Sequence, residues 1–307
     1  MIRPSSLAAA ARPLLTSAAR ATPATTAAAA ATAARLSTTR MLRDQHDASG
    51  TTHFGFRTVR EEDKESLVRG VFSSVADNYD LMNDAMSGGV HRCWKSAFIE
   101  RLAPAPDTRL LDVAGGTGDI ALRFLDYVRE QNGGALGAAH VTVFDINPEM
   151  LRVGAQRFSK LGLENGGPHV SFVEGNAEEL AGIEDNSMDA YTIAFGIRNC
   201  THIDRVIRQA YRVLKPGGRF MVLEFGKVNN PLLSTLYDAY SFRVIPHLGQ
   251  ILANDRDSYQ YLVESIRKFP TQQQFVDMMK HEGFQVVGQG YEDLTFGVAT
   301  IWSGWKL

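Results

Sequence analysis

Short apolar stretches alternate with amphipathic helical stretches through the middle of this 307-residue chain. The apolar stretches predict strands over residues 109–113, 141–145, 170–174, 188–195 and 219–225. The segments between them have apolar residues at helical spacing and predict helices over 119–130, 148–161 and 202–214. This alternation is typical of a mainly parallel sheet covered by helices on both faces, so the sequence predicts an α/β fold.

A glycine-rich turn follows the first predicted strand. Residues 114–118 are Ala-Gly-Gly-Thr-Gly, and a helix is expected to begin at Asp119. Glycine permits positive φ and close backbone approach to a ligand, and the N–H groups at a helix start suit a polar or anionic group. Ligands of parallel sheets bind beyond the carboxyl ends of the strands. The candidate binding residues in this turn are therefore Gly115, Gly116, Thr117 and Gly118.

The ends of the first three strands have side chains suited to three parts of one ligand. Asp112 ends the first strand and can hold an ammonium group, and Asp145 ends the second and can accept both hydroxyls of a ribose. Asn176 and Ala177 follow the third strand, where an amide side chain and a backbone N–H can bind an adenine edge. An amino-acid tail, a ribose and an adenine in one line describe S-adenosylmethionine. The alternative for each residue is a cap or a turn.

The same turn also fits a different cofactor. Gly116-x-Gly118-x-x-Ala121 matches the dinucleotide fingerprint and favours an NAD-dependent oxidoreductase. The carboxylate of Asp112 before the glycines and the segment after the fifth strand argue against that interpretation. Tight binding of S-adenosylhomocysteine would exclude it.

Composition and charge exclude other classes of protein. The 32 Lys and Arg residues against 34 Asp and Glu give a net charge of −2, which does not point to nucleic acid as a partner. Two cysteines far apart, Cys93 and Cys200, cannot form a disulfide framework or a cysteine-based zinc site, and no metal ligands are predicted. No apolar run reaches the ~18 residues of a membrane-spanning helix.

Residues 1–43 differ from the rest of the chain in composition. They contain six arginines and no Asp, Glu or Lys, and most of the rest is Ala, Ser and Thr. This composition predicts a mitochondrial transit peptide, the alternatives being a plastid signal or an alanine-rich tail with no targeting role. Its removal would leave 26 basic and 34 acidic residues, a net charge near −8. Residues 44–65 are expected to be a polar linker, followed by one domain over 66–307.

Two longer motifs carry a resemblance to a known family. Tyr79 to Trp94 matches the pattern Y-D-x-M-N-x₃-S-x₃-H-x₂-W, and residues 212–226 are Arg-Val-Leu-Lys-Pro-Gly-Gly-Arg-Phe-Met-Val-Leu-Glu-Phe-Gly. With the segments 195–199, 237–242 and 253–255, the chain resembles the ubiquinone/menaquinone biosynthesis C-methyltransferase family over 66–307. Gly226 stands where that family usually has Ser or Thr.

The resemblance implies a fold and a cofactor. The fold is that of the class I S-adenosyl-L-methionine-dependent methyltransferases, a seven-stranded, mostly parallel sheet with its last strand reversed. Strands over 284–288 and 295–301 would supply the reversed end. The cofactor is S-adenosyl-L-methionine, and Ala194 on the fourth strand would contact it through the backbone, where many bacterial relatives have Ser.

The resemblance also implies an activity and a setting. The reaction is methylation of a ring carbon in a polyprenyl methoxy-benzoquinol during ubiquinone synthesis. A homodimer, a multi-subunit coenzyme Q complex and peripheral contact with the matrix face of the mitochondrial inner membrane are further expectations. An O-methyltransferase acting on a related phenol, an O- or N-methyltransferase acting on a small soluble substrate, and a non-catalytic scaffold remain alternatives.

The chemistry of ring methylation suggests catalytic residues. A ring carbon becomes nucleophilic when a neighbouring hydroxyl loses its proton, so a base or a fixed positive charge is needed. Arg198 is the leading candidate for stabilising the ring oxygen, with a water held by Arg198 and Asn199 as proton acceptor; the alternative for Arg198 is a salt bridge. Tyr79 is expected to bind a ring oxygen or to pack. His91 is expected to act as a base or to make a structural hydrogen bond.

An apolar segment follows the fifth strand and breaks the alternation. Residues 226–256 are predicted to form a substrate lid, because a polyprenyl tail needs an apolar wall. Ordinary core or a dimer interface is the alternative. The candidate substrate-binding residues are Asn83 in the first motif and, in the lid, Tyr237, Tyr240 and Arg243. Arg243 would meet the quinol head or a lipid phosphate.

Overall fold

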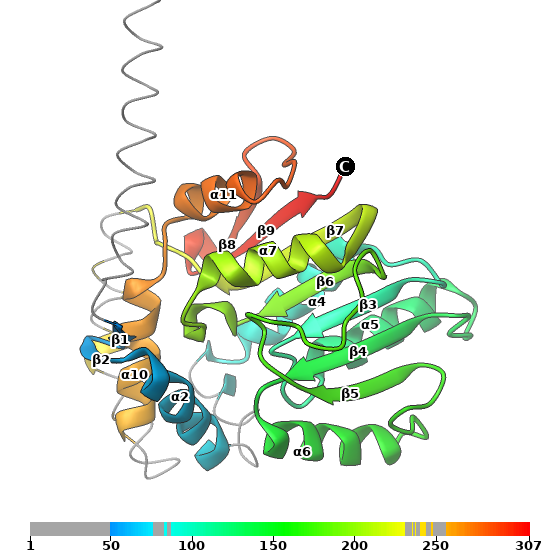
Figure 1. Cartoon of the computed structure of the whole chain (residues 1–307), viewed down its shortest axis with the longest axis horizontal. Helices are drawn as coiled ribbons and strands as arrows, with labels where there is room; N and C mark the ends of the chain where they lie inside the picture. The colour runs from blue at the N-terminus through cyan, green and yellow to red at the C-terminus, as the bar shows by residue number, and fades with distance from the viewer. Residues whose placement is uncertain are drawn as a thin grey trace, which may run out of the picture. The chain divides into compact units, whose positions relative to one another are not determined.

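The computed structural model describes residues 50–75, 83–84, 87–230, 235, 237, 240–243, 247 and 256–307. Seven strands form one sheet in the order β5-β4-β3-β6-β7-β9-β8 (Figure 1). The strands are β3 (Arg109–Val113), β4 (His140–Asp145), β5 (Val170–Glu174), β6 (Met188–Ala194), β7 (Leu214–Phe225), β8 (Tyr291–Leu294) and β9 (Ala299–Trp305). Strands β5, β4, β3, β6 and β7 pair in parallel, and β9 is antiparallel to both neighbours. The predicted sheet with a reversed last strand is confirmed.

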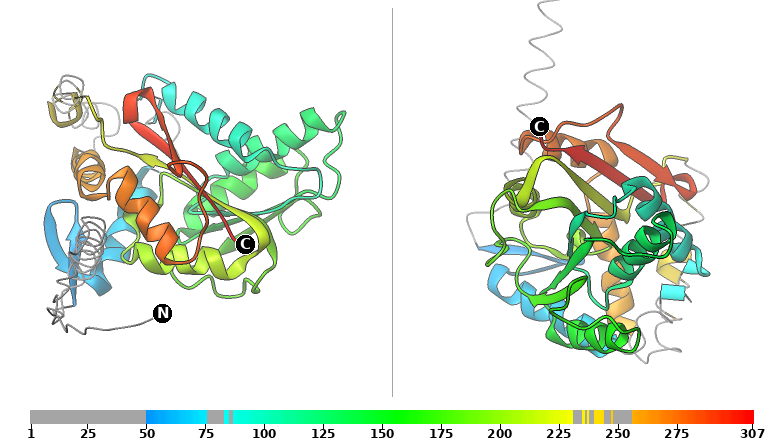
Figure 2. Two further views of the ribbon diagram at one scale, coloured as in Figure 1. Left: turned by 90° about the horizontal axis from the view of Figure 1, so that it is seen from above. Right: turned by 90° about the vertical axis from the view of Figure 1, so that its right-hand side faces the viewer.

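Helices cover both faces of the sheet, as the alternation predicts (Figure 2). One apolar core joins the sheet to α4 (Val90–Leu102), α5 (Asp119–Gln131) and α6 (Pro148–Ser159). The other joins it to α7 (Ile203–Val213) and α11 (Gln272–His281). Strand β3 shows the period of two, since Leu110 packs into the first core and Leu111 into the second, both fully buried.

The two C-terminal strands lie later in the chain than predicted. Of the strand expected at 284–288, only an isolated bridge from Gln285 to Trp305 forms. Residues 295–297, expected to begin the last strand, form the 3₁₀ turn η3, in which Phe296 has a φ of 59° that no strand permits. The register with β7 explains the shift, because β9 pairs with it from Ala299 opposite Phe225 to Trp305 opposite Arg219.

The predicted linker is partly wrong. Residues 51–60 form a hairpin of β1 (Thr51–Phe54) and β2 (Arg57–Arg60), and α2 (Glu61–Val75) begins before the expected Ser66. The hairpin lies beside α10 (Arg256–Lys268) (Figure 1). The Phe54 ring stacks there on that of Tyr261, with 4.1 Å between the ring centroids. A lone hairpin is marginal in water, so this distant aromatic contact is what stabilises a segment that is polar in sequence.

Gly118 illustrates a close approach that the fold requires. Its φ is +79°, and a Cβ there would lie 2.8 Å from Cε2 of Phe158 on α6. Gly217 has a similar φ of +83° with no atom within 4 Å of a Cβ. We expect Gly118→Ala to lower the unfolding free energy by about 3 kcal/mol and Gly217→Ala by about 1 kcal/mol, the difference being the clash. Urea denaturation measures both, and equal losses would contradict the packing role of Gly118.

Candidate functional site

A cavity of about 330 Å³ lies at the carboxyl ends of β3, β4, β5 and β6. The structure brings most of the predicted cofactor residues together around it, namely Asp112, Gly115, Gly116, Thr117, Asp145, Asn176, Ala177 and Ala194. Gly118 is not part of this lining. It begins α5 and packs on Phe158, so its role in the structure is conformational.

Asp112 is a fully buried carboxylate with one unused oxygen. Its Oδ1 accepts a hydrogen bond from Thr192 Oγ1 at 2.8 Å, and Oδ2 has no partner. Burial raises the pKa of Asp112 to about 7, although the Thr192 hydroxyl acts in the opposite direction. A buried acceptor without a partner is costly. The site therefore favours a ligand that brings a donor, above all a cationic one, to Asp112.

The glycine turn is held by the second carboxylate. Asp145 Oδ2 accepts the N–H of Gly116 at 2.9 Å, and Oδ1 accepts that of Asn147 at 2.8 Å. Burial raises the pKa of Asp145, although these backbone donors counteract it. Each oxygen keeps a second lone pair, so Asp145 can both shape the turn and accept ligand hydroxyls.

Two residues at the same edge of the sheet have a strained backbone. Ala114 after β3 and Phe195 after β6 have φ values of 50° and 56°, which side-chain-bearing residues rarely adopt. A Cβ at Gly196 would lie 2.4 Å from that of Ala114, so the two loops are in close contact. Strained residues held by their surroundings cluster at functional sites.

Helix α2 borders the cavity, which the sequence did not predict. Glu61, Glu65 and Arg69 contribute to the lining. Asn176 Nδ2 lies 3.4 Å from Glu65 Oε2, while its Oδ1 accepts the N–H of Glu178 at 2.8 Å. Asn176 thus closes a turn, which was the alternative for it, and it also reaches α2.

A second cavity of about 390 Å³ adjoins the first and is largely apolar. Its walls include five predicted catalytic or substrate-binding residues, namely Asn83, His91, Arg198, Tyr237 and Tyr240. The side chains of Phe72, Lys95 and Phe195 line both cavities, so the two meet there. Arg243 is exposed and does not line this cavity, so its contact with the quinol head or with a lipid phosphate stays a prediction. Tyr79 and most of the predicted lid lie outside the described residues.

Arg198 forms a buried ion pair with Glu224. Its Nη1 lies 2.8 Å from Glu224 Oε1, and the two side chains are 3% and 0% exposed. Nε of Arg198 is buried without a partner, and the guanidinium lies 5.4 Å from the ring centre of Phe225. The salt bridge considered for Arg198 is therefore present, but it does not remove the residue from the apolar cavity. The sequence analysis missed Glu224, although an acidic residue inside the apolar run 220–225 indicates a buried charge that needs a partner.

Asn199 and Arg198 line different cavities. Asn199 lines the first cavity rather than the second, and its Oδ1 accepts a hydrogen bond from the hydroxyl of Tyr261 at 3.0 Å. Burial raises the pKa of Tyr261, which keeps this hydroxyl a donor. A water shared by Arg198 and Asn199 stays a prediction.

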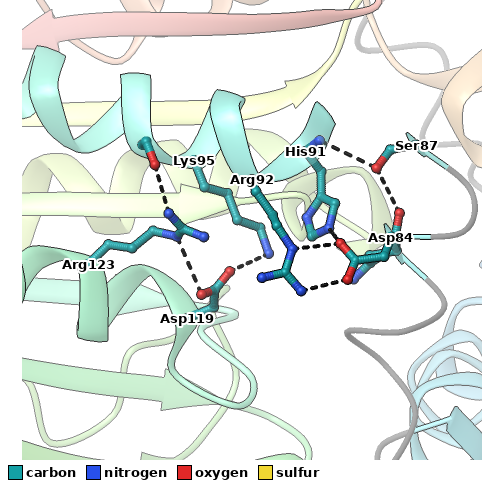
Figure 3. Close-up of polar contacts among 9 residues, drawn as sticks. Asp84, Ser87, His91, Arg92, Lys95, Asp119 and Arg123 are labelled. Carbon is teal, nitrogen blue, oxygen red and sulfur yellow. Dashed lines mark hydrogen bonds and ion pairs between the residues drawn. The ribbon is translucent and has the colours of Figure 1, made fainter. Parts of the chain in front are cut away.

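Two groups of charged residues lie beside the cavities (Figure 3). One joins α4 to α5, and the other joins Asp84 to α4. Lys95 Nζ lies 2.8 Å from Asp119 Oδ2, and Arg123 lies 3.4 Å from Asp119 Oδ1. Asp84 lies 2.8 Å from Nε2 of His91. Neither Lys95 nor Asp84 was singled out in the sequence, because nothing local indicates that Asp84 turns back onto α4.

Known proteins share the fold and much of the sequence of this chain. The crystal structure of the [4+2]-cyclase SpnF shares the fold, with a TM-score of 0.55 at 18% identity over 79% of this chain and 96% of that one. Proteins named mitochondrial 2-methoxy-6-polyprenyl-1,4-benzoquinol methylase are far more similar in sequence. The Dictyostelium discoideum protein is 51% identical over 88% of this chain and 93% of its own length. The Drosophila melanogaster protein is 55% identical over 84% and 85%, respectively.

The family model agrees with these relatives. The model of the ubiE/COQ5 methyltransferase family matches residues 58–306, nearly the whole described region. The match includes α2, which borders the first cavity, and the reversed strand β9. With two adjoining cavities at the sheet edge, one lined by several charged residues and one largely apolar, the chain belongs to the ubiE/COQ5 methyltransferase family.

Proposed function

We propose that this chain transfers the methyl group of S-adenosyl-L-methionine to a ring carbon of a polyprenyl methoxy-benzoquinol in ubiquinone synthesis. The observation that carries the proposal is the junction of the two cavities at Phe72, Lys95 and Phe195. A cavity with carboxylates and a glycine turn in its lining suits the cofactor, and a largely apolar one suits a prenylated ring, so their contact is where a methyl group would pass. Relatives about 50% identical are named for this substrate.

The residues of the first cavity fit the cofactor by their own chemistry. Asp112 offers its unpartnered Oδ2 to the ammonium group, and Asp145 offers lone pairs to the ribose hydroxyls. Asn176 and Ala177 lie where the adenine is expected. A Cβ at Gly115 would lie 2.8 Å from Val143 Cγ1 and 2.9 Å from the Asp112 carbonyl oxygen, so only glycine fits this part of the cradle.

Within this proposal the protein provides position and charge. The bound cofactor supplies an activated methyl group. The walls of the apolar cavity, with Trp94 and Phe225 among them, exclude water and hold the ring against the junction. Arg198 is held by Glu224 and lines the apolar cavity, where its positive charge stabilises the charge that develops on the ring oxygen.

The proposal extends to the setting of the protein. Relatives from Dictyostelium discoideum and Schizosaccharomyces pombe are named mitochondrial, and residues 1–43 have the composition of a transit peptide. In the described part of the chain, no helix is long and apolar enough to span a bilayer. We place the protein on the matrix side of the inner membrane as a peripheral homodimer within a coenzyme Q biosynthesis complex.

A labelling experiment tests the reaction. The full chain is given S-adenosyl-L-methionine labelled in its methyl group and a reduced methoxy-benzoquinol with a short prenyl tail. Mass spectrometry is expected to find the label on a ring carbon. Label on a ring oxygen would make the protein an O-methyltransferase. No transfer, with S-adenosylhomocysteine binding intact, would contradict the proposal and favour a scaffold role.

A further inference from the structure

The hydrogen bonds of His91 and Asp84 distinguish the two roles expected for this histidine (Figure 3). Its Nε2 lies 2.8 Å from Asp84 Oδ1, and Arg92 donates to both oxygens of the same carboxylate at 2.7 and 2.5 Å. Arg92 and His91 together hold the pKa of Asp84 well below its usual range. An ionised carboxylate can only accept, so Nε2 carries the proton and the lone pair of the neutral ring lies on Nδ1.

Nδ1 of His91 lacks a partner. It is buried and accepts no hydrogen bond from any residue that the structure describes. The same side chain lines the apolar cavity together with Arg198. A buried acceptor left unpaired costs about 1–3 kcal/mol. A ligand in the cavity that brings a hydroxyl or another donor to Nδ1 would remove this cost.

The charges around His91 keep its ring neutral at physiological pH. Burial is the largest cause and lowers the pKa of His91, and Lys95 of the same helix lowers it further. Asp84 and Asp119 act in the opposite direction without overcoming the burial. Lys95 is itself paired with Asp119, and Arg198 across the cavity is paired with Glu224. A neutral imidazole with a lone pair is a competent proton acceptor.

We propose that Nδ1 of His91 is the general base that takes the proton of the ring hydroxyl, and that Asp84 is the positioning residue that fixes its tautomer. This inference rests on the proposed function. The O–H bond breaks, its electron pair stays on the ring oxygen, and a new N–H bond forms on His91. The electron-rich ring carbon then bonds to the methyl group, whose bond to the cofactor's sulfur breaks with its electron pair staying on the sulfur. The ring-carbon proton leaves afterwards to solvent, and the imidazolium returns its proton to the oxygen, so one proton is released per turnover.

The test compares His91→Gln, Asp84→Asn and the surface control His281→Gln in the full chain. Glutamine keeps a donor toward Asp84 but has no basic lone pair. We expect His91→Gln to lower the single-turnover rate of methyl transfer by 10²–10⁴-fold. Asp84→Asn removes the ionised carboxylate, and an amide can offer either its oxygen or its NH₂ group to Nε2, so the tautomer of His91 is no longer fixed and the rate should fall. His281 is 69% exposed, and its variant should match the wild type.

Two readouts separate a base from a merely structural histidine. A ring-fluorinated acceptor has a more acidic hydroxyl and depends less on a base. His91→Gln should therefore lower the rate of methyl transfer to this acceptor by a smaller factor. In the pH–rate profile of Asp84→Asn, the acidic limb should lie at lower pH than in the wild type, because the carboxylate that raises the pKa of His91 is gone. Bound S-adenosylhomocysteine, measured by calorimetry, should be unchanged in both variants.

The outcomes are distinguishable. Equal deficits of His91→Gln on both acceptors, or an unmoved acidic limb in Asp84→Asn, would overturn the role of His91 as base and leave the proposed function standing. A wild-type chain that binds S-adenosylhomocysteine but methylates neither acceptor would overturn the proposed function and this inference with it.

Discussion

Glu224→Gln is expected to lower the unfolding free energy by about 3–5 kcal/mol and to abolish methyl transfer. The variant leaves the guanidinium of Arg198, which is 3% exposed, without its counter-charge in an apolar wall. Removing one partner of a buried ion pair is strongly destabilising, because the remaining charge is desolvated and no longer compensated by an opposite charge. Chemical denaturation monitored by fluorescence measures the loss.

A double variant separates stability from chemistry in this pair. Replacing both partners by apolar residues of similar size is often neutral for stability. Arg198→Met with Glu224→Leu should therefore recover most of the unfolding free energy lost in Glu224→Gln, yet remain inactive. A double variant that recovers both stability and methyl transfer would show that the pair is a structural feature of the cavity wall.

Asp112→Asn is expected to weaken S-adenosylhomocysteine binding by about 100-fold. Hydrogen bonds to charged groups contribute about 1.5–3 kcal/mol, and the carboxylate is fully buried with Oδ2 unused. The surface control Asp126→Asn, on the exposed side of α5, should bind like the wild type. Isothermal calorimetry measures the difference, and unchanged affinity would rule out Asp112 as the ammonium ligand.

The pH dependence of binding gives an independent check on Asp112. Its pKa is raised to about 7 in the folded chain, so below that pH the carboxyl is protonated and must lose a proton to bind an ammonium group. Affinity should rise about tenfold per pH unit up to about pH 7 and level off above it. Without the ligand, the contribution of Asp112 to the unfolding free energy falls as pH rises from about 4 to about 7, because the folded state holds this proton more tightly. Asp112→Asn should lack both contributions, which the difference from the wild type measures.

Local patterns determined the sheet and the polar side of the site. The alternation of strands and helices predicted the parallel order, and β3, which ends at Val113, matches its prediction residue for residue. Asp112, Asp145 and the glycine turn were found because each lies at the end of a strand, and parallel strands end at one edge. These signals depend on periodicity and short spacing, which the sequence displays directly.

Contacts between distant segments decided the rest. Arg198 and Glu224 are 26 positions apart and pair only because β6 and β7 are neighbours. The hairpin β1–β2 depends on Tyr261, and the junction of the cavities depends on α2, α4 and the loop after β6 meeting in space. The ends of β8 and β9 were set by register with β7. Such pairings depend on which elements pack together, and a buried charge or lone pair has no partner in the sequence until the tertiary structure supplies one.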